Sequence, residues 1–149
     1  MVIKIVEKDE EYYKMQDIID SLKKSRRIDE AGAIFTFEGS VRGIEKRAEG
    51  EKIISKIILT TPDKEKSIKE LENISESVKI KYGVFEIGII HFIGEFYTGD
   101  SLFLAAVIGP HRKETLDALK EIIERTKYEI NFKKEEISND TTKIIMAGG

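Results

Sequence analysis

Apolar side chains recur every three or four positions in three stretches of the chain, which predicts three helices that each bury one face. The first helix is expected after Asp9, a suitable N-cap residue. The second is expected to start at Thr61-Pro62-Asp63, with Pro62 in the first helical position, and to end at Gly83. The third follows His111-Arg112. The predicted buried positions are Met15, Ile18, Ile19 and Leu22 in the first helix, Ile68, Leu71, Ile74 and Val78 in the second, and Leu116, Leu119, Ile123 and Thr126 in the third.

Shorter apolar runs, rich in β-branched residues or alternating with polar ones, predict strands between these helices. The apolar run at 102–108 is expected to be central in its sheet, and a turn at 98–100 to join it to 84–92 as an antiparallel hairpin. The charged segment 43–52, which contains glycines, is expected to be a mobile loop. The complete set of predicted strands is 1–6, 33–38, 53–60, 84–92, 102–108, 130–137 and 141–146. This order mixes hairpins with helices and favours an α+β fold over a doubly wound parallel sheet.

Length and composition narrow the possible functions. A chain of 149 residues is the size of one domain, taken as 1–149. The net charge of -3 gives no sign of a general nucleic-acid binder. The absence of cysteine excludes disulfides, thiolate metal sites and cysteine nucleophiles, and two histidines are too few for a convincing metal site. With no membrane-spanning apolar run and no signal-peptide pattern, the protein is expected to be soluble and cytoplasmic, without a membrane partner.

Positive side chains lie at two places where a backbone could bind an anion. His111 and Arg112 stand at the start of the third helix, where free N–H groups favour phosphate or carboxylate. Arg42 follows a strand and is flanked by Gly39 and Gly43, and its guanidinium can bind an anion with two parallel hydrogen bonds. The alternative for all of these charges is a solvated surface position. His91, near a strand end, is expected to be structural.

Four stretches together resemble the catalytic (large) subunit family of molybdopterin synthase. They lie between residues 32 and 136, and their order and spacing carry the resemblance. They are Gly32-Ala33-Ile34-Phe35-Thr36-Phe37-Glu38-Gly39-Ser40-Val41-Arg42, His91-Phe92-Ile93-Gly94-Glu95 followed by Gly99-Asp100, Gly109-Pro110-His111-Arg112, and the lysines Lys127 and Lys134. The chain departs from the family pattern where Phe92 replaces an arginine, where Leu59 stands in a segment that usually carries tyrosine and glutamate, and where Lys133 replaces a tryptophan.

The resemblance implies an α/β-hammerhead-like domain with mixed or antiparallel sheets and about three helices. It implies a sulfurtransferase of molybdenum cofactor biosynthesis that converts precursor Z, a cyclic pyranopterin monophosphate, into molybdopterin. The sulfur would come from a thiocarboxylate on the C-terminal Gly-Gly tail of a ubiquitin-like small subunit, without a metal or other cofactor. Two large subunits would form a homodimer within a heterotetramer. This chain itself ends in Gly148-Gly149, as that small subunit does, although two terminal glycines also occur by chance.

The resemblance also implies roles for five side chains. Arg42, His111 and Arg112 would bind the phosphate and the pterin edge of the substrate. Lys127 would transfer a proton or handle the acyl group, and Lys134 would position the substrate or the tail. A second reading is a catalytically degenerate paralogue that binds the ubiquitin-like subunit or an anionic metabolite. A third, a structural oligomer, predicts that these five side chains are scattered in space.

Overall fold

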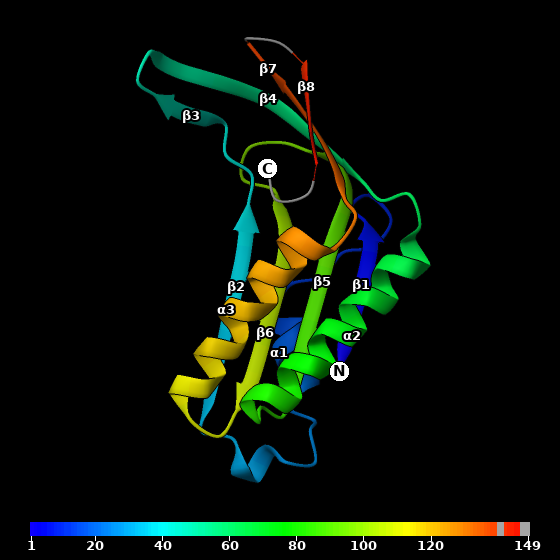
Figure 1. Ribbon diagram of the computed structural model, residues 1–149, viewed down its shortest axis with the longest axis vertical. Helices are drawn as coiled ribbons and strands as arrows, with labels where there is room; N and C mark the ends of the chain where they lie inside the picture. The colour runs from blue at the N-terminus through cyan, green and yellow to red at the C-terminus, as the bar shows by residue number, and fades with distance from the viewer. Residues whose placement is uncertain (140–141, 147–149) are drawn as a thin grey trace.

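The most apolar strands of the chain lie at the centre of a sheet in the computed structural model, which describes residues 1–139 and 142–146 (Figure 1). Strand β6 (Ser101–Gly109) pairs antiparallel with β5 (Glu86–Phe96) on one side and with β2 (Ala33–Ser40) on the other. Strand β1 (Val2–Glu7) pairs parallel with β5. The continuous burial of β6 agrees with this position, because a central strand covered on both faces reads as an unbroken apolar run.

Strand β5 continues into a second group of strands beyond Gly94. There it pairs antiparallel with β4 (Gly50–Thr60), which pairs in turn with β7 (Lys133–Ser138). Strand β8 (Thr142–Met146) extends this group beside β7, and β3 (Ile44–Arg47) forms a hairpin with β4. Gly94 has a φ of +123°, a conformation that other residues rarely adopt. The glycine therefore lies where β5 changes partner from β1 to β4.

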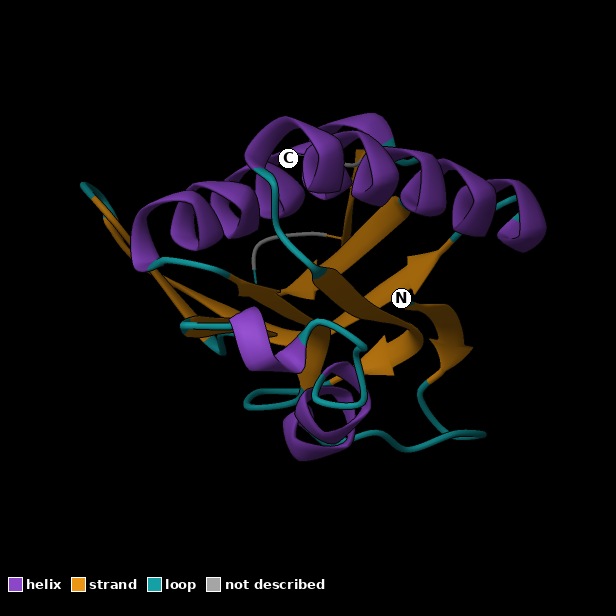
Figure 2. Ribbon diagram, turned by 90° about the horizontal axis from the view of Figure 1, so that it is seen from below, coloured by secondary structure: helices purple, strands orange, loops and turns teal. Residues whose placement is uncertain are grey.

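Helices cover both faces of the central strands. Helix α2 (Lys64–Tyr82) and helix α3 (Arg112–Glu129) lie side by side on one face, and α1 (Met15–Leu22) lies on the other (Figure 2). Helix α3 packs on β6 and β2, α2 on β1 and β5, and α1 on β5 and β6. A short 3-10 helix (Ile28–Glu30) precedes β2. The buried apolar side chains form one cluster, so the α+β fold with three α-helices predicted from the sequence is confirmed.

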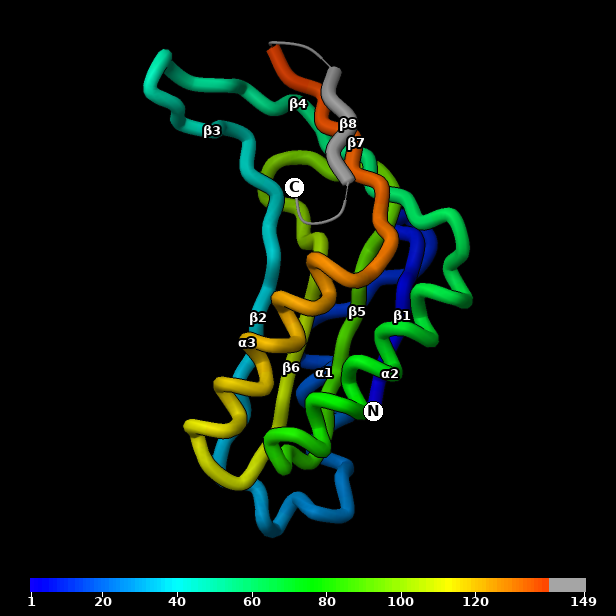
Figure 3. Tube along the Cα trace, viewed as in Figure 1, coloured from blue at the N-terminus to red at the C-terminus, as the bar shows by residue number. Residues whose placement is uncertain are grey.

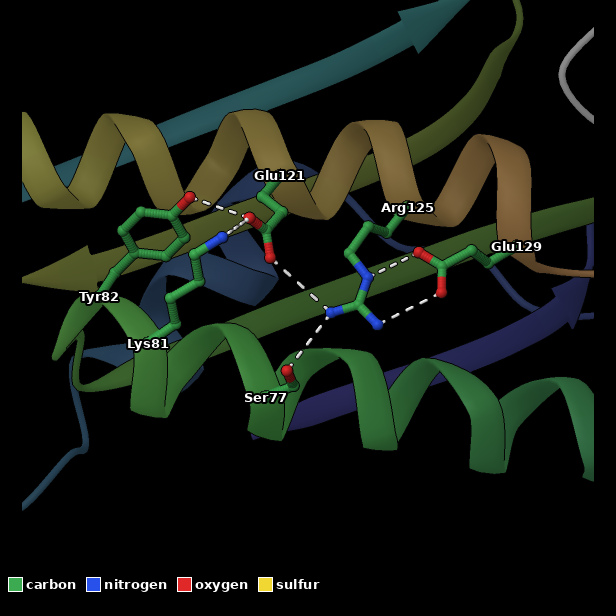
Figure 4. Close-up of polar contacts among 6 residues, drawn as sticks. All are labelled: Ser77, Lys81, Tyr82, Glu121, Arg125 and Glu129. Atoms are coloured by element: carbon green, nitrogen blue, oxygen red, sulfur yellow. Dashed lines mark hydrogen bonds and ion pairs between the residues drawn. The ribbon is translucent and has the colours of Figure 1, made fainter.

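A network of polar contacts closes the outer seam between α2 and α3 (Figure 4). Lys81 Nζ lies 2.6 Å from Glu121 Oε1, and the Tyr82 hydroxyl donates to the same oxygen over 2.9 Å. Arg125 binds Glu129 through two guanidinium nitrogens, at 2.6 and 3.2 Å, and also approaches Ser77. Ion pairs this close to solvent are each worth less than about 1 kcal/mol, so the network supplements the apolar contacts beneath it.

The buried face of α3 differs from the predicted one. Leu119 and Thr126 are buried as predicted, and Ile123 is partly buried, but Leu116 is 42% exposed. The positions that face β6 are instead Thr115, Ala118, Leu119, Ile122 and Thr126. Small side chains allow the helix to lie close to the sheet, and the buried Thr115 hydroxyl is satisfied because it donates to the carbonyl oxygen of His111.

Segment 43–52 is not a loop, because it forms β3, a tight turn and the start of β4 (Figure 3). Most of the charged side chains in this segment are exposed, so the sequence showed no buried face that would predict a strand. Two helix starts also differ from prediction. Helix α2 begins at Lys64 and not at Pro62; its N-cap is Asp63, whose carboxylate accepts a hydrogen bond from the amide of Lys66 at 3.1 Å. Helix α1 begins after Lys14, not after Asp9.

The remaining strands differ from prediction mainly at their ends. Strand β7 starts at Lys133 instead of residue 130, because Ile130 and Phe132 are buried in the connection from α3. Residue 141, predicted as the start of the last strand, and the terminal Gly148-Gly149 lie outside the described residues.

Gly32 gives a test of the close contact between the start of β2 and the turn after β6. Its amide donates to the carbonyl oxygen of Gly109 over 3.0 Å, and an added Cβ would overlap the carbonyl oxygen of Pro110. We expect Gly32→Ala to lower the free energy of unfolding by about 1–3 kcal/mol in urea denaturation. Gly39→Ala, within β2, is the matched control, because its Cβ would lie no closer than 3.5 Å to its neighbours. Equal stability of the two variants would contradict the proposed overlap.

Candidate functional site

Three of the five side chains predicted for the site gather near the second group of strands. Arg42 follows the end of β2, Lys127 lies in the last turn of α3, and Lys134 is the second residue of β7. The charges of Arg42 and Lys127 both act on Lys134 and help to lower the pKa of its amine. The fold therefore brings these three cations together from elements far apart in the sequence.

Lys134 occupies the most sheltered position of the three. It pairs in register with Leu59 of β4, which itself pairs with Gly94 of β5. Partial burial is the largest cause of its lowered pKa, because an ammonium group loses hydration there. The positive charges of Arg42 and Lys127 lower this pKa further. Lys52 acts in the same direction, and Glu136 opposes it. Among the residues described, no hydrogen-bond or ion-pair partner contacts the Lys134 amine.

The connection between α3 and β7 sets the relative positions of Lys127 and Lys134. Ile130 and Phe132 in this connection are 1% and 3% exposed. The ring of His91 on β5 stacks on Phe132 with 4.1 Å between ring centroids. Burial lowers the pKa of His91 to about 4, so the imidazole is neutral at physiological pH and its Nδ1 lies 3.0 Å from the Phe92 carbonyl oxygen. His91 thus has the structural role predicted for it.

Arg42 is held in place by the backbone of the residue before it. Val41 is 4% exposed, its amide donates to the carbonyl oxygen of Asp100 over 3.0 Å, and its carbonyl oxygen accepts from the amide of Gly99 over 2.9 Å. These two bonds fasten the strand exit to the turn between β5 and β6. The exposed Arg42 side chain therefore starts from a fixed backbone position beside the lysines.

A buried ion bridge that sequence reasoning missed lies next to Lys134. Lys52 of β4 and Glu136 of β7 are 5% and 4% exposed, and the Lys52 amine donates to Glu136 Oε1. The same amine lies 2.7 Å from Glu45 Oε2 of β3. Hydrogen bonds to Glu136 and then to Glu45 raise the pKa of Lys52. Glu45 and Lys52 are directly paired in the β3–β4 hairpin. The sequence did not reveal this pair, because the segment was expected to be a loop.

His111 and Arg112 do not join this cluster within one chain. They stand at the opposite end of α3, because Arg112 and Lys127 are 15 residues apart in that helix, a rise of about 22 Å. His111 is exposed, and its Nδ1 lies 2.8 Å from Glu114 Oε1. Together with Gly32 and Pro110, the two residues line a shallow pocket. The sequence-predicted site is therefore divided between the two ends of α3 (Figure 1).

The cluster around Lys134 is suited to an anionic ligand. The cations Arg42, Lys52, Lys127 and Lys134 outnumber the carboxylates Glu45 and Glu136. Within the described part of the chain, no group of three or more His, Asp or Glu side chains could hold a metal ion. No helix in that part is long and apolar enough to cross a membrane. Fold and site together define an α+β protein with a cationic site for an anion.

Comparisons with known proteins agree with this description. The sequence model of the MoaE protein family matches residues 8–129. A molybdopterin synthase catalytic subunit of Staphylococcus aureus is 30% identical over 112 residues, 75% of this chain and 72% of that protein. The crystal structure of molybdopterin synthase from Staphylococcus aureus superposes with a TM-score of 0.78 at 26% identity, covering 96% of each chain. The chain belongs to the MoaE protein family.

A structure from Helicobacter pylori shares the fold at lower identity. It is a complex of subunits 1 and 2 of molybdopterin-converting factor. The superposition has a TM-score of 0.70 at 21% identity and covers 99% of this chain and 90% of the other.

His91 allows a test of how the α3–β7 connection is packed. Because burial lowers its pKa to about 4 from 6.5, the unfolded chain binds this proton more readily, and stability falls as pH falls through this range. We expect a loss of about 2 kcal/mol between pH 7 and pH 5 from this group, measured by denaturant unfolding. His91→Phe, which keeps a stacked ring, should lack this part of the loss. The exposed His111→Gln serves as control and should retain it, and equal pH dependence in all three proteins would contradict the assignment.

Proposed function

We propose that this chain is the large, catalytic subunit of a molybdopterin synthase and acts as a sulfurtransferase in molybdenum cofactor biosynthesis. Family membership and the names of its relatives support this role. The single observation that carries the chemistry is Lys134, a sheltered amine without an ion-pair partner in the described structure, on which the charges of Arg42 and Lys127 both act. An amine whose charged form is disfavoured can accept a proton or act as a nucleophile near neutral pH.

The proposed substrate is precursor Z, whose cyclic phosphate matches the positive charge of the cluster. Arg42 is exposed beside the lysines and can bind a phosphate oxygen pair with its planar guanidinium. Opening the cyclic phosphate concentrates negative charge on oxygen. Cations that are already fixed in position stabilise that charge without reorganising, which lowers the barrier to reaction.

Lys127 and Lys134 have different roles in the proposed reaction. The burial of Lys134 favours it as the proton-transfer group, a role that the sequence had suggested for Lys127. Lys127 is exposed at the end of α3, with its amine 5.5 Å from the ring centroid of Tyr128, and is placed to meet an arriving chain terminus. That terminus is the thiocarboxylated Gly-Gly tail of a ubiquitin-like small subunit. The two-subunit complex from Helicobacter pylori supports such a partner.

A homodimer would reunite the divided site. In this arrangement His111 and Arg112 of one protomer reach the Lys134 cluster of the other, inside a cytoplasmic heterotetramer with two small subunits. The distance along α3 prevents one chain from using all five side chains on a single small substrate. The exposure of His111 and its position at the helix N-terminus leave it accessible to a second copy.

A non-catalytic paralogue is the less favoured reading. The departures at Leu59, Phe92 and Lys133 had raised it, but the position of Leu59 fits an active site. Leu59 lies directly opposite Lys134 and supplies an apolar neighbour instead of a counter-ion. Phe92 is 4% exposed and belongs to the core, and Lys133 is exposed. The convergence of Arg42, Lys127 and Lys134 is better explained by catalysis than by chance.

Reconstitution tests the proposed activity. The chain is mixed with a thiocarboxylated small subunit and precursor Z, and molybdopterin is measured. We expect Lys134→Ala and Lys127→Ala to lower the rate about 100-fold or more, because each removes a group that acts in proton transfer or acyl handling. Lys133→Ala is the matched control, since Lys133 is exposed and precedes Lys134 on the opposite face of β7. Unchanged turnover in Lys134→Ala would overturn the assignment.

Mixed variants test the shared site. Arg112→Ala and Lys134→Ala should each be inactive alone in the reconstituted assay. After the two are unfolded and refolded together, random pairing should restore about a quarter of the native rate, because each mixed dimer contains one intact site. Native chain carried through the same refolding is the control. Absence of recovery, with dimers present in sedimentation analysis, would show that His111 and Arg112 do not complete the partner's cluster.

A further inference from the structure

Lys52 is buried at a point where three strands meet. Its amine lies between Glu45 of β3 and Glu136 of β7, while Lys52 itself belongs to β4. Only 5% of its side chain is exposed, and the Glu136 side chain is similarly buried. A lysine is seldom buried to this extent unless it is paired, since removing its charge from water is costly. The burial of Lys52 therefore indicates a specific pairing role, because a lysine that only aids solubility would be exposed.

Glu136 connects this bridge to Lys134. The two residues are separated by one position on β7, so their side chains lie on the same face of the strand. Glu136 is also the acidic group that acts on Lys134 electrostatically, and its charge opposes the lowering of the Lys134 pKa. Yet the recorded hydrogen bond of Glu136 goes to Lys52, and none joins it to Lys134 in the described structure.

We propose that Lys52 is a positioning residue of the active site, which binds Glu136 and so keeps this carboxylate from pairing with Lys134. With Glu136 occupied, the Lys134 amine stays available for the anionic substrate and the arriving thiocarboxylate. Because Lys52 binds the buried Glu136 carboxylate, this carboxylate pairs with Lys52 and not with Lys134. The inference rests on the proposed role of Lys134 in the synthase reaction.

The bridge also anchors the β3–β4 hairpin beside the site. Through Glu45, Lys52 holds β3, and the charge of Arg42 acts on the same Glu45 carboxylate. The charged groups that face Lys134 are Glu136 on β7, Arg42 after β2, Lys127 on α3 and Lys52 on β4. Removing Lys52 takes away one repelling cation and releases one attracting carboxylate, and both changes favour the charged form of Lys134.

The test measures the titration of Lys134 directly in the full chain. Lysines are labelled with 13C at Cε, the Lys134 signal is assigned by its loss in Lys134→Arg, and its pKa is followed by NMR. Lys52→Met should raise the pKa of Lys134, and Lys52→Arg, which keeps the charge, should leave it near the native value. Glu136→Gln should lower it, because the opposing negative charge is lost.

The opposite changes in the Lys134 pKa expected for Lys52→Met and Glu136→Gln distinguish a positioning role from a general loss of structure. Loosening of the fold would expose Lys134 and raise its pKa in both single variants, because burial is the main cause of the native shift. In the double variant Lys52→Met/Glu136→Gln, no carboxylate at position 136 is left to pair with Lys134. Its Lys134 pKa should therefore be at or below the native value. If Lys52→Met does not fold, Lys52→Gln removes the charge but keeps a donor for Glu136, and should raise the pKa of Lys134 through loss of the repelling cation alone.

An unchanged pKa of Lys134 in Lys52→Met or Lys52→Gln would overturn the proposal. A Lys134 pKa that stays above the native value in the double variant would also overturn it. In the reconstituted assay, the pH at which the rate rises should move upward in Lys52→Met and downward in Glu136→Gln. If the native chain makes no molybdopterin while the NMR titrations follow the expected pattern, the proposed function fails and the control of Lys134 by Lys52 stands. If the native chain is active and the titrations do not move, only the role of Lys52 fails.

Discussion

The change of partner along β5 is the constraint on which the rest of the structure depends. Up to Ile93 the strand pairs with β1, and from Gly94 onward it pairs with β4. This transition needs the φ of +123° that Gly94 adopts, because a side chain there would strain the backbone. Gly94, Leu59 and Lys134 follow one another across β5, β4 and β7, so Lys134 lies in the row where the two strand groups join. The site is thereby tied to the most heavily buried strands of the protein.

The same junction explains why positive charges can be concentrated here. Grouping cations near partly buried backbone costs free energy, since each loses hydration and repels the others. The fold offsets this cost in two ways. Glu45 and Glu136 are inserted among the cations through Lys52, and the buried Ile130 and Phe132 fix the α3–β7 connection on which Lys127 and Lys134 depend. The polar bridge and the apolar connection thus both hold the cluster in place.

The sequence predicted those parts of the fold that follow simple burial patterns. The hairpin β5–β6 was predictable because its second strand is apolar throughout, and α3 because its period of three to four is clear, although Leu116 shows that the period alone does not fix the buried face. The β3–β4 hairpin was not predictable in this way. Its one deeply buried polar residue is Lys52, which runs against the usual exposure of lysine, so the pattern there was typical of a loop. Arg42, Lys127 and Lys134 could be named from spacing and resemblance, whereas the pairing of Glu136 with Lys52 depends on strand register.

The division of the predicted site follows from helix geometry and has a physical consequence. Arg112 and Lys127 both lie in α3, whose rise separates them whatever the surrounding packing. A chain alone therefore presents an excess of cations near the C-terminal end of α3 and, at the other end, an exposed helix N-terminus with Glu114 in its first turn. Charge interactions strengthen when water is excluded, so an anionic substrate enclosed between two such surfaces would be bound more strongly than at either surface alone. Completing such a site between two chains would release the energy of assembly only when substrate and partner are both present.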